Sequence, residues 1–249
     1  MSEVSRARPS DEVTARVDEL DLQLGGSGVF SQIATFSQKL ASRYLMSAGD
    51  FVCGLQYVID PKTNLYFSSA SLARSACEFA NRGSWMAQPD ISDEQRIARA
   101  IAIWQNTLQE ERGVLEPEAL TALQRVNSDI DRWRNERSFR ETAGRPDPTR
   151  LFELIDPARG KDVYKHLCNA THGSLLALLA GQISAIHRDE EGTSETWWRV
   201  LIACQYGLEA ARRVNLLLGV QPPAGLVYCW ELTEHFLAIF DAREGADRS

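Results

Sequence analysis

The chain has 249 residues, of which 44% are hydrophobic and 24% are charged, a composition typical of a globular protein with a substantial core. Its formal net charge of −7 argues against general electrostatic attraction to nucleic acid or to an anionic membrane, although a local basic patch could still bind RNA. The five cysteines show no Cys-x-x-Cys spacing, which favours reduced thiols over a disulfide framework or a zinc site.

We expect no targeting or membrane segment in this sequence. Its first residues lack the apolar stretch of a secretory signal. The longest apolar run, 174–186, is interrupted by Gly181 and Gln182 and is too short to cross a bilayer. We therefore expect a cytoplasmic protein that makes no use of a membrane.

Helical spacing of apolar residues defines the expected elements in chain order. Residues 1–28 are expected to form a flexible segment with a short helix at about 12–24. A long helix is expected from Val29 to about Gln56 and a second one over about 65–86. Ser92, followed by acidic residues, is a signal for the start of the next helix.

Residues 93–141 are predicted to form a helical hairpin. Apolar residues recur in both arms at the spacing of helices packed side by side as in a coiled coil. These positions are Ile97, Ile101, Trp104 and Leu108 in the first arm and Leu123, Val126, Ile130 and Trp133 in the second. The arginine-rich end of the second arm also carries acidic residues, which favours a solvated face over a nucleic-acid patch. Pro146 and Pro148 predict a loop.

Three more helices are expected, at about 160–187, 194–218 and 226–241, and no segment has the pattern of a β-strand. The predicted fold class is therefore all-α, a helical bundle with a protruding helical hairpin. In this prediction residues 29–241 form a single domain, with the hairpin at about 93–141 and a tail at 242–249.

The segment YKHLCNATHG, residues 164–173, concentrates polar side chains at the start of the helix expected at 160–187. Lys165, Asn169 and His172 are spaced by four and three residues, so they share one face, and His166 flanks it. Histidine titrates near neutral pH and suits proton transfer, while lysine can neutralise a phosphate. The alternative is a polar stripe that faces water or a subunit interface.

A second candidate group lies in ARSACEFANRGSW on the helix expected at 65–86. Arg74 and Glu78 stand one turn apart among small apolar residues. A covered Arg–Glu pair is costly unless it is well satisfied, and such pairs are often found at functional sites. The sequence leaves both readings open, a functional pair and a structural one.

Two other patterns carry weaker hypotheses. Glu231 and His235 have the spacing of two metal ligands, but no matching Glu-x-x-His pair occurs on another helix. The Trp197–Trp198 pair is interpreted as packing or as an interface. P-loop, Gly-x-Ser-x-Gly and His-Glu-x-x-His motifs do not occur. The sequence therefore predicts no metal and no cofactor.

Two stretches together resemble a known family. They are SLARSACEFANRGSWMAQPDISDEQRIARA and VYKHLCNATHG, within residues 65–110 and 160–187. They resemble helical proteins of actinobacterial type that are related to the HEPN superfamily. That resemblance implies an all-α and often dimeric protein, and many HEPN proteins are metal-independent RNases of toxin or antiviral systems.

The HEPN motif is an arginine, commonly followed by a polar residue, with a histidine after a gap of four to six residues. Lys165 falls at the arginine position, His166 at the polar position and His172 at the histidine. Lysine lacks the planar fork of arginine, so the chain departs from the pattern at its first residue. Arg159 and His166 also satisfy the bare spacing, but Gly160 follows Arg159.

The resemblance assigns a role to each residue of the motif. His172 would act as base or acid toward an RNA 2′-hydroxyl and its leaving group. Lys165 would stabilise the charge on the reacting phosphate, and Asn169 and His166 would orient the substrate. The expected protein is thus an HEPN-like RNA-binding protein or metal-independent endoribonuclease, a homodimer with the two His172 residues facing a shared groove.

Two alternatives stay open beside the RNA hypothesis. The first is a small-molecule enzyme or binding protein with an enclosed pocket inside one subunit, lined by Arg74, Glu78, Tyr164 and His172. The second is a non-catalytic interaction module that binds a protein partner through the 93–141 hairpin.

Overall fold

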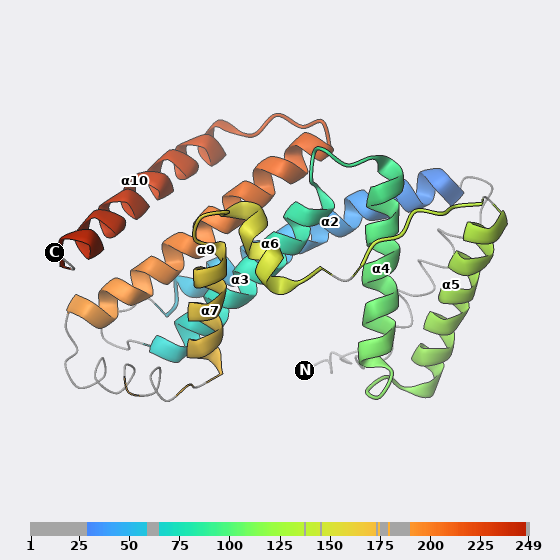
Figure 1. Cartoon of the computed structure of the whole chain (residues 1–249), viewed down its shortest axis with the longest axis horizontal. Helices are drawn as coiled ribbons and strands as arrows, with labels where there is room; N and C mark the ends of the chain where they lie inside the picture. The colour runs from blue at the N-terminus through green and yellow to red at the C-terminus, as the bar shows by residue number, and fades with distance from the viewer. Residues whose placement is uncertain are drawn as a thin grey trace, which may run out of the picture. The chain divides into compact units, whose positions relative to one another are not determined.

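The computed structural model describes residues 29–58, 65–136, 138–144, 146–172, 174, 179 and 190–247. Over these ranges the fold is all-α, as predicted, with eight helices and no strand (Figure 1). The helices are α2 (Val29–Leu55), α3 (Tyr66–Met86), α4 (Asp93–Glu111), α5 (Pro117–Glu136), α6 (Pro148–Ile155), α7 (Gly160–Thr171), α9 (Glu190–Leu217) and α10 (Ala224–Asp247). No helix of the described part combines the length and hydropathy of a membrane span. The short helix expected at about 12–24 lies outside these ranges.

Backbone contacts divide the chain into two compact units. Unit 1 contains the described residues within Met1–Lys39 and Asp90–Arg145, and unit 2 contains those within Leu40–Pro89 and Pro146–Ser249. Helix α2 contributes its first part to unit 1 and its remainder to unit 2.

In unit 1, helix α4 begins where the sequence predicts. The hydroxyl oxygen of Ser92 accepts a hydrogen bond from the backbone N–H of Gln95, and the Gln95 side chain accepts one from the backbone N–H of Ser92. This reciprocal capping box satisfies two N–H groups that a helix start leaves unpaired. The structure thus confirms the predicted helix start at Ser92.

Helices α4 and α5 form the hairpin expected at 93–141 and pack through the residues that the periodicity selected. Six of the eight predicted positions are buried in one cluster, and Trp104 and Leu108 are partly buried against it. The buried six are Ile97, Ile101, Leu123, Val126, Ile130 and Trp133. The spacing therefore identified this core correctly.

Helix α6 corrects the loop expected at Pro146 and Pro148. Asp147 accepts hydrogen bonds from the backbone N–H groups of Thr149 (2.8 Å) and Arg150 (3.4 Å), and Pro148 occupies the first helical position. Proline is favoured there because the helix does not use its missing N–H. The second proline thus starts a helix, and only Pro146 lies in the loop.

In unit 2, helix α3 has a face of small residues that allows close packing. Ala73, Ala76 and Ala80 are fully buried, and α3 packs against α9, α6 and α7. Phe79, on another side of α3, stacks on Phe51 of α2 with ring centres 5.5 Å apart. Helix α10 packs against α9 (Figure 1). Helix α3 is therefore the centre of this bundle.

The described part of helix α7 is shorter than the predicted helix at 160–187, because it ends at Thr171. Residues 173, 175–178 and 180–189 lie outside the description. Helix α7 begins at Gly160, where a Cβ atom would lie 2.5 Å from the carbonyl carbon and oxygen of Phe152. Glycine is therefore required where α7 meets α6. The last two helices extend the expected ranges, α9 starting at Glu190 and α10 continuing to Asp247.

Candidate functional site

His172 lies at the C-terminal end of helix α7. Its backbone N–H donates a hydrogen bond to the carbonyl of Cys168 (2.9 Å), while its φ and ψ of −86° and 7° depart from the helix. The side chain is exposed. The segment YKHLCNATHG thus spans the end of a described helix, and its second histidine lies at the helix terminus.

Arg74 of α3 contacts both His172 and Glu78. Its Nε donates to Glu78 Oε1 at 2.8 Å, and its Nη1 lies 2.9 Å from Nε2 of His172. Arginine has no acceptor atom, so Nε2 of His172 must be the acceptor. This hydrogen bond requires a neutral imidazole with its proton on Nδ1. The side chains of Arg74 and Glu78 are 20% and 29% exposed, so solvent reaches the pair.

Tyr164 and Cys168, about two turns and one turn before His172, complete this group. The hydrogen bond with Cys168 and then burial raise the pKa of the Tyr164 hydroxyl; the charge of Glu78 adds to the rise and that of Arg74 opposes it. Burial lowers the pKa of Arg74, but the hydrogen bond to Glu78 and the charge of Glu78 outweigh burial. The pKa of Arg74 therefore lies above its usual value. We call Arg74, Glu78, Tyr164, Cys168 and His172 the Arg74–His172 group.

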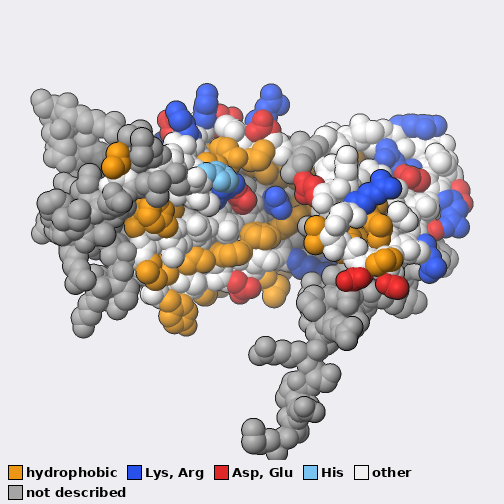
Figure 2. Space-filling model, turned by 90° about the horizontal axis from the view of Figure 1, so that it is seen from below, with side chains coloured by type: hydrophobic (Ala, Val, Ile, Leu, Met, Phe, Trp, Pro, Cys, Tyr) orange, Lys and Arg blue, Asp and Glu red, His pale blue; other side chains and the backbone are white. Residues whose placement is uncertain are grey.

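The structure brings together some of the predicted site residues and separates others. Arg74, Glu78, Tyr164 and His172, the four residues proposed to line a small-molecule pocket, interact within one chain. His172 itself is exposed. Figure 2 shows a histidine at the molecular surface beside cationic and anionic side chains.

The other residues of the predicted α7 stripe lie outside this group. Lys165 and Asn169 have exposed side chains, and the hydrogen-bond partner of His172 comes from α3 instead. His166 is exposed and belongs to a different set of contacts, with Glu195 and Trp198 of α9. The two histidines therefore contact different neighbours of α7: His172 contacts α3 and His166 contacts α9.

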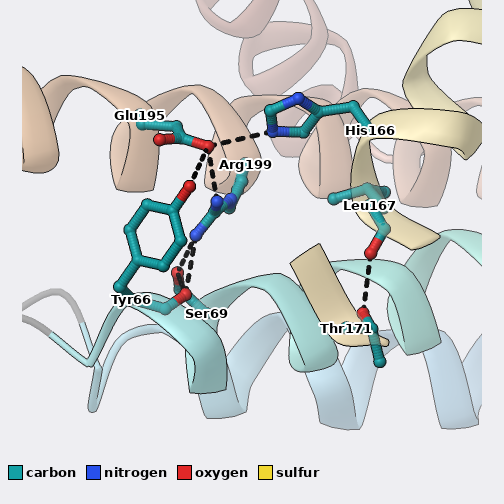
Figure 3. A network of polar contacts seen from close by, with 7 residues as sticks. All are labelled: Tyr66, Ser69, His166, Leu167, Thr171, Glu195 and Arg199. Atoms are coloured by element: carbon teal, nitrogen blue, oxygen red, sulfur yellow. Dashed lines mark hydrogen bonds and ion pairs between the residues drawn. The ribbon is translucent and has the colours of Figure 1, made fainter. Parts of the chain in front are cut away.

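Glu195 is the centre of that second set, which is drawn in Figure 3. Its Oε1 atom accepts hydrogen bonds from the Tyr66 hydroxyl (2.9 Å), Arg199 Nη2 (2.5 Å) and His166 Nε2 (3.0 Å). For this contact His166 must carry a proton on Nε2. The residues come from α3, α7 and α9, so one carboxylate oxygen joins three helices.

Arg199 is fully buried and makes most of its contacts with the start of α3. Its Nη1 donates to the carbonyl oxygen of Tyr66 (2.6 Å) and to the hydroxyl of Ser69 (3.0 Å). The guanidinium carbon lies 4.0 Å from the centre of the Tyr66 ring. These contacts and the Glu195 carboxylate compensate the burial of its charge. We call Tyr66, Ser69, His166, Glu195 and Arg199 the Glu195 network.

The network sets the charge state of its carboxylate. Burial raises the pKa of Glu195, but the hydrogen bond from His166 and the charge of Arg199 outweigh it, so the pKa lies below its usual range. For Tyr66, burial raises the pKa, the charge of Arg199 opposes the rise, and the charge of Glu195 adds to it. Glu195 is therefore held in its ionised form.

Apart from His166, the residues of the Glu195 network were not predicted from the sequence. One signal was present: Glu195 and Arg199 stand four residues apart, the spacing that drew attention to Arg74 and Glu78. They flank Trp197 and Trp198, which were interpreted only as packing or an interface. Trp198 does pack, edge to face against His166 at 5.0 Å, while Trp197 is exposed.

A metal site at Glu231 and His235 finds no further ligand. In the described part of the chain, no group of three or more His, Cys, Asp or Glu residues could hold a metal ion. Both side chains lie exposed on α10.

The chain was compared with protein-family models, with curated proteins and with solved structures, and none of them matches. These comparisons therefore give no support to the resemblance to the HEPN superfamily, and the structure shows only that the described fold is all-α.

Proposed function

We propose that the Arg74–His172 group binds the phosphate of RNA, and that the protein is an HEPN-like RNA-binding or metal-independent RNA-cleaving protein of a toxin or defence system. One observation carries the proposal. The motif on α7 has Lys165 where an arginine is expected, and Arg74 of α3 supplies a guanidinium 2.9 Å from His172. A histidine and an arginine side by side can move a proton and hold a phosphate.

Glu78 gives Arg74 a fixed orientation for this role. The Glu78 carboxylate accepts a hydrogen bond from Nε of Arg74, and Nε2 of His172 accepts one from Nη1. Among the described residues these contacts leave the Nη2 edge of the guanidinium for an incoming oxygen. Phosphate oxygens accept from that edge in the bidentate geometry that arginine favours. Lys165, exposed on α7, adds local positive charge to an otherwise acidic protein.

The reaction assigned to His172 is transesterification. When a phosphate oxygen replaces Nε2 of His172 as the acceptor of the Arg74 Nη1 proton, the freed Nε2 lone pair of His172 accepts the proton of the 2′-hydroxyl. The 2′-oxygen bonds to phosphorus, the bond from phosphorus to the 5′-oxygen breaks, and water protonates the leaving oxygen. The products are a 2′,3′-cyclic phosphate and a 5′-hydroxyl. His166 and Asn169 keep the orienting role that the resemblance gives them.

A second candidate function is binding of a small phosphate-bearing molecule. It is favoured because the four residues named for such a pocket interact within a single chain and need no second copy. The chemistry recognised is the same, a phosphate on arginine beside a histidine. The two candidates differ in the size of the ligand.

The test is incubation of the purified protein with mixed-sequence single-stranded RNA in EDTA, resolved on a denaturing gel. We expect cleavage by the wild type and a loss of about a hundredfold or more in His172→Ala, the usual contribution of proton transfer. Arg74→Ala should lose as much cleavage activity as His172→Ala, and Arg74→Lys should lose somewhat less. Lys161→Ala, which removes an exposed charge from the same helix, is the control and should cleave like the wild type.

Absence of cleavage by the wild type, or equal cleavage by His172→Ala, would overturn the nuclease proposal. Binding of labelled RNA and of a nucleoside monophosphate, followed by fluorescence polarisation and calorimetry, then separates the remaining readings. Binding of RNA that Arg74→Ala abolishes supports an RNA-binding protein. Arg74-dependent binding of the monophosphate alone supports the second candidate. If the protein binds neither RNA nor the monophosphate, both candidate functions are overturned.

A further inference from the structure

Helix α10 exposes large apolar side chains on the face that does not pack against α9. Its buried residues include Thr233 and Leu237, and Glu234 accepts a hydrogen bond from Gln205 of α9 (3.1 Å). Several of its other residues are large, apolar and open to solvent. They are Val227, Tyr228, Leu232, Phe236 and Ile239.

Four of these residues form one continuous stripe. Tyr228, Leu232, Phe236 and Ile239 are separated by four, four and three residues, so their side chains project from one face of the helix. Tyr228 is 63% exposed and Phe236 is 44% exposed. The stripe is about 16 Å long at 1.5 Å per residue. Aromatic and aliphatic residues at this density are characteristic of the centre of a protein interface.

A polar edge runs along one side of the stripe. Glu231 and His235, both exposed, stand one turn apart and neighbour the stripe on the same side, because each directly precedes one of its members. The His235 ring also lies edge to face with the ring of Phe236, 5.8 Å between centres. This edge therefore carries an acceptor and a donor, one turn apart.

We propose that the α10 stripe is the interface of a homodimer, in which two copies of α10 pack antiparallel about a two-fold axis near residue 234. This inference is independent of the proposed function. In an antiparallel pair the same edge of each helix faces its counterpart, as in antiparallel coiled coils. Leu232 then lies opposite Phe236 of the second copy.

Charge complementarity selects a second copy as the occupant. In this arrangement Glu231 of each chain lies within one turn of His235 of the other, so the carboxylate accepts a hydrogen bond from the imidazole. The two-fold axis makes the pair twice. A patch that carries both an acid and a base close to the two-fold axis is self-complementary, which is the requirement for an isologous interface. The pattern also gives Glu231 and His235 a role that needs no metal.

The experiment is the molar mass of the full-length chain in solution, measured by sedimentation velocity over a wide concentration series. A reducing agent is present throughout, because Cys53 and Cys229 are exposed. We expect a concentration-dependent dimer for the wild type. Leu232→Glu places a second carboxylate beside Glu231 in each chain, close to the two-fold axis. This variant should weaken the dimer at least a hundredfold. Val114→Glu, at an 81% exposed apolar position in unit 1, is the matched control and should leave the dimer unchanged.

A charge swap tests the partner assignment. Glu231→His alone should weaken the dimer about tenfold, because the histidines then face one another. The double variant with Glu231→His and His235→Glu should recover it. Circular dichroism of each variant checks the fold. A wild-type chain that stays monomeric throughout the series overturns the proposal. The proposal is also overturned if Leu232→Glu leaves the dimer intact, or if the charge-swapped double variant does not recover dimer formation.

Discussion

The guanidinium of Arg199 lies 4.0 Å from the centre of the Tyr66 ring and donates a 2.6 Å hydrogen bond to the carbonyl oxygen of the same residue. The first residue of α3 is thus held at two points by a fully buried cation of α9. Since the carbonyl at a helix start and the ring of a tyrosine are both electron-rich, the two contacts share one electrostatic cause.

Replacement of Arg199 should destabilise unit 2. Arg199→Met removes the cation and leaves the carboxylate of Glu195 without its charged partner, which costs about 3 kcal/mol of unfolding free energy. Urea denaturation followed by circular dichroism measures the loss. Arg212→Met is the matched control, because the Arg212 side chain is 48% exposed and its loss should cost less than about 1 kcal/mol. Equal losses in both variants would contradict the structural role given to Arg199.

Glu195 should make the stability depend on pH in the acidic range. Its pKa in the folded state lies below the ordinary glutamate value. Ionised Glu195 therefore contributes stability above the unfolded pKa, and that contribution is lost as the pH falls through the folded pKa. Glu195→Gln should lower the unfolding free energy near neutral pH and make its fall on acidification shallower.

Urea midpoints measured from neutral pH down to about pH 3 test this prediction. The pKa of Glu209 is also lowered, because hydrogen bonds from Arg212 and Arg213 outweigh its burial. Glu209→Gln should therefore remove its own share of the acid dependence, and the double variant should remove both. A Glu195→Gln profile parallel to that of the wild type would refute the assignment.

Periodicity and local signals predicted the parts of the fold that depend on near neighbours. Ile97, Val126 and Trp133 were selected by spacing alone and lie in the hairpin core. Ser92 caps α4 through a residue only three positions away. Helix α6 was not predicted, because its 8 residues are too few for a periodic signal and because the helix starts at a proline.

Contacts across long stretches of sequence could not be derived in the same way. Arg74 and Glu78 were identified as a pair because they share one helix, but the contact of Arg74 with His172 spans 98 positions. The contact of Tyr66 with Glu195 spans 129. Helical spacing states which residues share a face and not which helix that face meets. The orientation of α7 across α3 and α9 therefore had to come from the structure.

Gly160 should be irreplaceable where α7 begins. A Cβ atom at this position would lie 2.5 Å from the backbone carbonyl of Phe152, and neither backbone can move without displacing its helix. Gly160→Ala should therefore cost about 1 to 3 kcal/mol, the usual range for overpacking. Gly49→Ala on α2 is the control. Its Cβ would meet no atom within 4 Å, so it should stabilise the helix by about 0.5 to 1 kcal/mol. Thermal unfolding of both variants decides whether the close approach of α6 and α7 exists in solution.

The α4–α5 hairpin should depend on Ile97, which is fully buried between the two arms. Truncation to alanine removes three carbon atoms from a close-packed cluster and leaves a cavity, so Ile97→Ala should cost about 2 to 5 kcal/mol. Hydrogen exchange is the suitable measurement, because it reports on α4 and α5 separately from unit 2. Protection of the amides in both arms should fall together, since each arm supplies half of the cluster. Val114→Ala, at the exposed turn between the arms, should leave protection within about 0.5 kcal/mol of the wild type. Loss of protection in α4 alone would show that the two arms do not share a core.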